Sequence, residues 1–231
     1  MPTAAHQAIH TAMTELTENF ASKAGPDAIL ASVTSSAVRL IDGIDVADVL
    51  VITDDKYESL APTNDLIREL DDLQLQFQEG PCLEAAVAES VIRSSDLRAE
   101  RRWPRFAEAA IERGVFSVLS FQLYSHRSGR GALNLFGRDP RTFSVEAEAI
   151  GAMLATHAAN ALVAADRQNQ FDSALASRDV IGQAKGVLME RFGVDAVQAF
   201  DLLSTLSQNS NTPLRQVAAQ VVETVTNRSS T

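Results

Sequence analysis

The segment SRDVIGQAKGVLMERF (177–192) has the spacing of an amphipathic helix but an unusual composition for one. Its apolar residues recur at helical intervals, with Ile181 and Leu188 at the centre of the apolar face. Gly182 and Gly186 stand inside this helical pattern, where each glycine costs about 1 kcal/mol relative to alanine. The missing side chains would let another helix or another molecule approach the backbone closely.

Two explanations for these glycines are open from the sequence. A neighbouring helix of the same domain could pack against them, or a polyanion could approach the bared backbone and be held by nearby cations. Arg178 and Lys185 are seven residues apart and therefore align on one shoulder of the apolar face, whereas Arg191 lies on the other shoulder. The second explanation predicts a nucleic-acid contact on this helix.

The helical pattern begins well before this segment. Residues 144–192 contain no proline, and apolar or small residues recur from Ile150 to Ala165 at gaps of three and four, which predicts one long helix. We expect this stripe to cover the sheet of its own domain up to about residue 158 and to form a two-chain coiled coil beyond it. The chain is therefore predicted to be a homodimer.

Two further helices follow the long one. Asp195 and Gln198 form a capping-box pair, and Pro213 suits the first turn of the last helix. The apolar faces of these two helices and of residues 181–192 can close one small core. The sequence therefore predicts a compact three-helix bundle, too small for much of a ligand pocket.

The part of the chain before the long helix alternates helical and strand patterns. Mostly neighbouring strands, with helices gathered to one side, predict an α+β domain built on an antiparallel sheet. Helices are expected at 4–22, 27–41 and 66–75, with another short one opening at Gly80-Pro81, and strands at 46–53, 57–61, 91–94, 115–124 and 131–136.

The composition restricts the class of protein. No run approaches the roughly 18 apolar residues that a membrane span needs, so a soluble, cytoplasmic protein without membrane contact is expected. The net charge is −10, yet residues 178–231 hold five Lys and Arg against five Asp and Glu. All the net negative charge therefore lies before residue 178, and the two parts of the chain are expected to have different functions.

The sequence lacks the usual signatures of catalysis and of metal binding. It has one cysteine and four histidines far apart, so neither a disulfide nor a metal site is predicted. No phosphate-binding glycine loop, nucleophile elbow or HExxH motif is present, and the protein is predicted not to be an enzyme. Cys82 is expected to be a buried, small apolar residue rather than a reactive thiol.

The last fifty residues contain four short motifs in this order: QAKGVLM (183–189), AFDLL (199–203), SQ (207–208) and LR (214–215). With these motifs they closely resemble the ANTAR domain, the RNA-binding output module of bacterial transcription antiterminators. The resemblance implies RNA contacts by several side chains. For Phe192 it implies stacking on an unpaired base, but Phe192 also falls on the core face, so burial of its ring in the bundle is the alternative. The residues implied to contact RNA are Arg178, Gln183, Lys185, Arg191, Phe192 and Arg215.

The first part of the chain contains EGPCLEAA (79–86), VFSVL (115–119) and GALNL (131–135). These segments follow the order of the pocket wall and hairpin strand of a GAF domain, which this part of the chain resembles. GAF domains often carry a proline late in the long strand, where this chain has FQL (121–123). The resemblance implies a small-molecule ligand or a dimerisation scaffold and leaves the ligand and any cofactor unknown.

Together these features predict three segments: a GAF-like sensory domain at 1–160, a coiled-coil linker helix at 161–177 and an ANTAR RNA-binding bundle at 178–231. The predicted function is signal transduction and transcription regulation. A GAF sensor would control an ANTAR output that binds paired stem-loops in leader mRNA and causes antitermination. The alternative is a ligand-binding or dimerisation module whose C-terminal bundle docks a protein partner.

Overall fold

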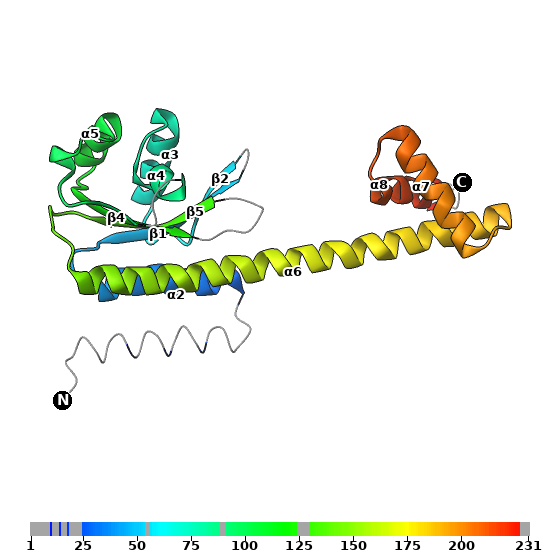
Figure 1. The fold of residues 1–231 in the computed structure, drawn as a ribbon, viewed down its shortest axis with the longest axis horizontal. Coiled ribbons are helices and arrows are strands. Elements are labelled where there is room, and N and C mark those ends of the chain that lie inside the picture. The colour runs from blue at the N-terminus through cyan, green and yellow to red at the C-terminus, as the bar shows by residue number, and fades with distance from the viewer. Residues whose placement is uncertain are drawn as a thin grey trace. The chain divides into compact units, whose positions relative to one another are not determined.

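The computed structural model describes residues 25–53, 56–87, 91–123 and 130–226, with the single positions His10, Thr14 and Glu18. The chain divides into two compact units, Met1–Ala165 and Asp166–Thr231, which we call the N-terminal and C-terminal units. Figure 1 labels their helices and strands. The helix predicted at 4–22 lies almost entirely outside the described residues.

A five-stranded antiparallel sheet forms the centre of the N-terminal unit. Its strand order is β2-β1-β5-β4-β3, and every neighbouring pair is antiparallel. This confirms the predicted α+β class. The strands are β1 (Val46–Thr53), β2 (Lys56–Leu60), β3 (Val91–Ser94), β4 (Ser117–Leu123) and β5 (Arg130–Gly137).

Helices cover both faces of this sheet, so the expectation that they gather on one side is wrong (Figure 1). The physical reason is visible in β1, where Ala47 and Val49 are buried in one core while Val46 and Leu50 are buried in the other. Because side chains alternate between faces, an unbroken apolar run needs cover on both. One face packs on α2 (Pro26–Leu40) and the first part of α6 (Val145–Phe192), the other on α3 (Leu66–Phe77), α4 (Pro81–Val87), a 3-10 turn at Leu97–Ala99 and α5 (Pro104–Glu112).

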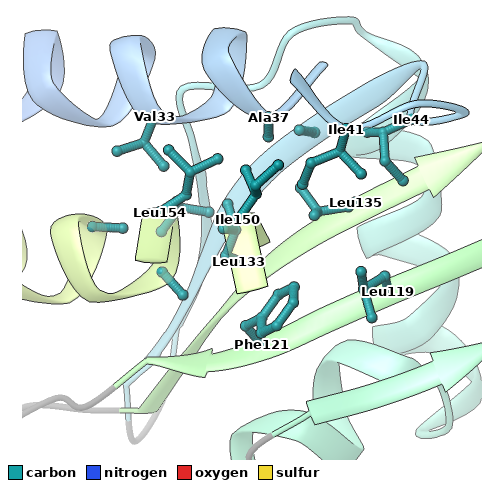
Figure 2. Close-up of a cluster of buried hydrophobic side chains, with 14 of the residues drawn as sticks. Val33, Ala37, Ile41, Ile44, Leu119, Phe121, Leu133, Leu135, Ile150 and Leu154 are labelled. Carbon is teal, nitrogen blue, oxygen red and sulfur yellow. The ribbon is translucent and has the colours of Figure 1, made fainter. Parts of the chain in front are cut away.

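The core between α2, α6 and the sheet is close-packed (Figure 2). Val33 from α2 and Leu154 from α6 meet Leu133 of β5 there, and all three are fully buried. A Cβ added to Gly151 on α6 would lie 2.3 Å from the ring of Phe121. This glycine is therefore needed for α6 to lie against the sheet.

The stripe of small residues on α6 belongs to this same core. Ile150, Leu154, Ala158 and Ala161 are at most 6% exposed and pack within the N-terminal unit. Burial therefore reaches Ala161, further than the expected limit near residue 158. Up to this residue the predicted coiled-coil seam cannot use this stripe, because its own domain already covers it.

Three helices form the C-terminal unit, which confirms the predicted bundle. They are the end of α6, α7 (Ala196–Ser210) and α8 (Leu214–Thr226). The predicted capping box is present, since Asp195 accepts from the Gln198 backbone N–H at 2.8 Å and the Gln198 side chain accepts from Asp195. The small core consists of Ala184, Leu188, Ala199, Leu203, Val217 and Ala218.

Candidate nucleic-acid interface and a buried polar row

Three of the predicted RNA-binding residues lie along one side of α6. Arg178, Lys185 and Phe192 are seven residues apart, and a helix of 3.6 residues per turn brings such residues back to within about 20° of each other. Arg178 is exposed and Lys185 is half-buried. Phe192 is 61% exposed because it is the last residue of α6, one turn beyond the core residue Leu188, so the core alternative for its ring is wrong.

The two glycines of α6 have no packing partner among the described residues. A Cβ added to either Gly182 or Gly186 would meet none of their atoms within 4 Å, and both positions are exposed. The explanation that a neighbouring helix of the bundle needs them is therefore wrong. Gly182 lies within one turn of Arg178 and Lys185, so bare backbone and positive charge share one surface, which we call the glycine face.

Four cations of the C-terminal unit have no acidic partner among the described residues. In the described part of the chain, Arg178, Lys185, Arg191 and Arg215 form no ion pair with Asp or Glu. Their guanidinium and ammonium groups are therefore available to an external anion.

The six predicted residues do not form a single surface. Gln183 precedes Lys185 by two residues and so lies about 200° away around the helix axis. Arg191 follows Lys185 by six residues and so lies about 120° away from it around the axis, and Arg215 lies on α8. Of the six, Arg178, Lys185 and Phe192 line up along one side of α6, with Gly182 beside Arg178 and Lys185.

A second cluster of polar side chains crosses the core of the N-terminal unit. Asp48 on β1 pairs directly with Asn134 on β5, and Asn134 pairs with Ser120 on β4. All three are fully buried, on the sheet face that α3 and α4 cover. Asp71 and Gln74 of α3 complete this cluster, which we call the buried polar row.

Hydrogen bonds connect the buried polar row. Asp48 accepts from the Asn134 amide at 3.0 Å and from the Ser59 hydroxyl at 2.8 Å. Asp71 hydrogen-bonds to Asp48, and the Gln74 amide donates to Asp71 at 3.5 Å. Three buried atoms have no hydrogen-bond partner within the described part of the chain: Asp71 Oδ2, Ser120 Oγ and Asn134 Oδ1.

Burial controls the protonation of the two carboxyl groups. Desolvation, and then the charge of Asp48, raise the pKa of Asp71 to about 9. Desolvation also raises the pKa of Asp48 to about 6, although the hydrogen bonds from Asn134 and Ser59 oppose it. At neutral pH the pair therefore retains one proton and one negative charge.

The sequence patterns did not predict the buried polar row. Its signal is a single charged or amide residue inside an otherwise apolar strand, as with Asp48 in VADVLVIT (46–53) and Asn134 in RGALNLFG (130–137). Only the strand register shows that these two residues are neighbours.

Cys82 lies at the edge of the buried polar row. Its thiol is fully buried and accepts a 2.8 Å hydrogen bond from the Gln74 amide, while its backbone N–H donates to Gln74 Oε1 at 2.9 Å. Desolvation raises the pKa of the Cys82 thiol well above its ordinary value. This confirms the predicted burial, and such a thiol is a poor nucleophile.

The described residues contain no group of three His, Cys, Asp or Glu side chains arranged to hold a metal ion. Among the helices that the structure describes, none has both the length and the apolar composition that crossing a membrane requires.

These features define a two-domain protein in which an α+β domain precedes a helical bundle. A family model described as a GAF domain matches residues 23–163, more than half of the chain, and one described as an ANTAR domain matches residues 169–222. The chain therefore belongs to the GAF domain family and carries an ANTAR domain. Together the two domains support a regulator in which a GAF sensor is coupled to an ANTAR output.

Solved structures share the GAF fold at low sequence identity. The GAF domain of a phosphoenolpyruvate-protein phosphotransferase from Coxiella burnetii has a TM-score of 0.56 and 18% identity, covering 73% of this chain and 99% of that one. The photosensory core module of a Stigmatella aurantiaca phytochrome has a TM-score of 0.57 and 12% identity, covering 90% of this chain and 46% of that one. Free methionine-R-sulfoxide reductase from Neisseria meningitidis, in complex with its substrate, has a TM-score of 0.53 and 14% identity, covering 73% of this chain and 97% of that one. No curated protein matches the chain.

Proposed function

We propose that this protein is a cytoplasmic transcription antitermination regulator whose ANTAR bundle binds paired stem-loops in leader mRNA. The binding would prevent formation of an overlapping terminator hairpin. The GAF domain would sense a small molecule and control this output. We propose domain boundaries at 1–160 for the GAF domain, 161–177 for the linker helix and 178–231 for the ANTAR bundle. The family matches at 23–163 and 169–222 lie close to these boundaries.

The glycine face is the observation that carries the RNA-binding proposal. Gly182 and Gly186 weaken the helix and serve no contact among the described residues, which favours a benefit from a molecule that binds there. Arg178 and Lys185 place positive charge, free of ion pairs in the described part of the chain, beside this bare backbone, which suits the phosphates of a nucleic acid. The exposed Phe192 ring offers a stacking surface to an unpaired base.

Helix α6 is the proposed connection between sensor and output. It runs without interruption from Val145 to Phe192, and its first part contributes to the core of the GAF domain while its end contributes to the core of the bundle. A change in packing around Ile150 or Leu154 could therefore alter the helix that carries the glycine face.

The protein is proposed to be a homodimer, with a seam on a different side of α6 from the buried stripe. Ala164, Gln168, Phe171 and Leu175 recur at gaps of four, three and four, and all four are exposed. Phe171 is 60% exposed and Leu175 is 44% exposed, which is unusual for large apolar residues on a helix that has no partner. A second copy of the same helix would cover them in a coiled coil.

Charges beside this seam favour a parallel arrangement of the two helices. In a parallel coil, Arg167 of one copy would face Asp172 of the other, since flanking positions five residues apart meet across the seam. An antiparallel coil would instead bring like charges together. Arg167 makes no ion pair among the described residues, so it is available for this contact.

The decisive experiment is to sequence the RNA that copurifies with the protein from its native cell and to measure gel retardation of that RNA at several salt concentrations. We expect enrichment of leader transcripts with paired stem-loops, and an affinity that falls as salt rises.

The second candidate, protein docking by the bundle, rests on the exposed apolar side chains Val197, Phe200, Leu202 and Leu206. It would be favoured if RNA retardation were absent while a protein partner was retained in pull-down experiments.

A further inference from the structure

The buried polar row is incomplete as a hydrogen-bonding network. Asp71 Oδ2, Ser120 Oγ and Asn134 Oδ1 are buried without a partner among the described residues, although nearly all buried polar atoms in native proteins have one. The residues that carry these atoms are neighbours, because Ser120 faces Asn134 across the β4–β5 pair and Asn134 is joined through Asp48 to Asp71. Three unsatisfied atoms on neighbouring residues favour one shared partner over three separate ones.

The missing group has to donate hydrogen bonds. Asn134 already uses its amide N–H₂ group on Asp48, so its free atom is a carbonyl oxygen, which only accepts. The hydroxyl of Ser120 can also accept, and so can the carboxyl group of Asp71 once it has lost its proton. The row therefore offers two acceptors, and a third after Asp71 ionises.

The missing group also has to suit a negative charge. The Asp48–Asp71 pair retains one charge in the core, and no Lys or Arg among the described residues forms an ion pair with either carboxyl group. The exposed Arg68 acts on Asp48 only at longer range. A buried charge is costly unless it is paired, so a cation in contact with the row would be strongly favoured.

We propose that the buried polar row binds a small organic cation with at least two N–H donors, such as a guanidinium, an amidinium or a primary ammonium group. Asp48 would supply the charge, and Asn134, Ser120 and Asp71 would accept the N–H groups. This inference rests on the proposed sensor role of the GAF domain for its regulatory meaning, but the binding itself can be measured without RNA. Since the row is fully buried, the cover formed by α3 and α4 has to open for the cation to enter, and association is expected to be slow.

Isothermal titration of the full-length protein with methylguanidinium chloride tests the proposal, with methylurea as the uncharged probe of matched shape and potassium chloride as the salt control. We expect saturable binding of methylguanidinium alone, with protons released because the cation favours the ionised form of Asp71. Proton release is measured by repeating the titration in buffers of different ionisation enthalpy. Binding of both organic probes with equal affinity, or of neither, would overturn the proposal and leave an internal water network as the occupant.

Variants separate this site from nonspecific charge effects. Asp48→Asn should weaken methylguanidinium binding about tenfold or more, since it removes the buried charge, and Ser120→Ala should weaken it less. The control is Asp72→Asn, which removes the exposed charge next to Asp71 on α3 and should bind like the wild type. If Asp48→Asn fails to fold, Ser120→Ala still tests the proposal, because methylguanidinium binding that is unchanged in this variant contradicts the role of Ser120 as an acceptor. RNA retardation measured in parallel tells failure of this site apart from failure of the proposed function.

Discussion

The side-chain amide of Asn134 donates a 3.0 Å hydrogen bond to Asp48 across the β1–β5 pair, inside the core of the GAF domain. Burial raises the pKa of both carboxyl groups, and this bond, together with the one from Ser59, favours the ionised form of Asp48. The charge of Asp48 then adds to burial in keeping Asp71 protonated. The Asn134 carbonyl oxygen is left without a donor among the described residues.

The stability of the folded protein should fall as pH rises from about 6 to 9. The pKa of Asp71 is raised to about 9 from the ordinary value of 3.8, so in this range the folded state holds a proton that the unfolded state has lost. Each such proton contributes a slope of up to about 1.4 kcal/mol per pH unit to the free energy of unfolding. Urea unfolding at several pH values measures this slope.

Asp71→Asn should remove this pH dependence while leaving the fold intact, because an amide resembles the protonated carboxyl group in shape and charge. Asp72→Asn, at the exposed neighbouring position, should keep the wild-type slope. A slope that is the same in both variants would show that Asp71 does not hold the proton.

Cys82 should not react with a thiol reagent in the folded protein. Its side chain is fully buried, and burial raises the pKa of the thiol, so the reactive thiolate is scarce. Titration with Ellman's reagent should show no fast-reacting thiol under native conditions and one thiol per chain in denaturant. Fast stoichiometric reaction of the native protein would contradict the buried position.

Replacing Gly182 or Gly186 with alanine should stabilise the protein and weaken RNA binding. Each added methyl group meets no atom of the described residues within 4 Å, so the change should increase the free energy of unfolding by about 0.4–1 kcal/mol. The same methyl group would hold RNA away from the backbone, and we expect affinity for the copurified RNA to fall about tenfold. Urea unfolding and gel retardation give the two measurements, and stabilised variants with wild-type RNA affinity would show that RNA binds elsewhere.

Lys185→Ala and Arg178→Ala should each weaken RNA binding more than they weaken folding. Neither side chain makes an ion pair in the described part of the chain, so the cost should fall on phosphate contacts. Loss of one contact should lower the slope of log affinity against log salt by roughly 0.7 to 0.9. Arg101→Ala removes the same charge from an exposed position in the GAF domain and should have little effect. Equal affinity for all three variants would place the RNA surface elsewhere.

The proposed parallel seam can be tested by disulfide cross-linking. Gln168→Cys and Leu175→Cys, introduced separately, should each give covalent dimers on oxidation, because a parallel in-register coil places each residue opposite its own copy. Native Cys82 can stay in place, since its thiol is buried. Asn169→Cys, exposed on another side of α6, serves as the control and should not cross-link. Cross-linking at only one of the two seam positions would indicate an antiparallel coil.

Local features of the fold were predictable from the sequence because they depend on neighbouring residues. The capping box of Asp195 and Gln198 needs only a spacing of three residues. The contact at the start of α6 is equally local, since Ser144 accepts from the Ala147 N–H at 3.1 Å. The period of the apolar residues likewise predicted the five strands and the three-helix bundle. The motif QAKGVLM (183–189) is contiguous in the chain, so the ANTAR resemblance could be read from its order of residues alone.

Only the tertiary structure decided which surfaces are covered. Periodicity shows that the face carrying Ala158 and Ala161 is apolar, but not whether a second chain or the sheet of the same chain buries it. The same limit applies to Gly182, whose bare backbone is informative because none of the described residues lies against it. Asp48, Asn134 and Asp71 are far apart in sequence, and strand register and helix packing bring them together. Sequence patterns determine local conformation through short-range spacing, whereas burial and the protonation that follows from it depend on contacts between distant residues.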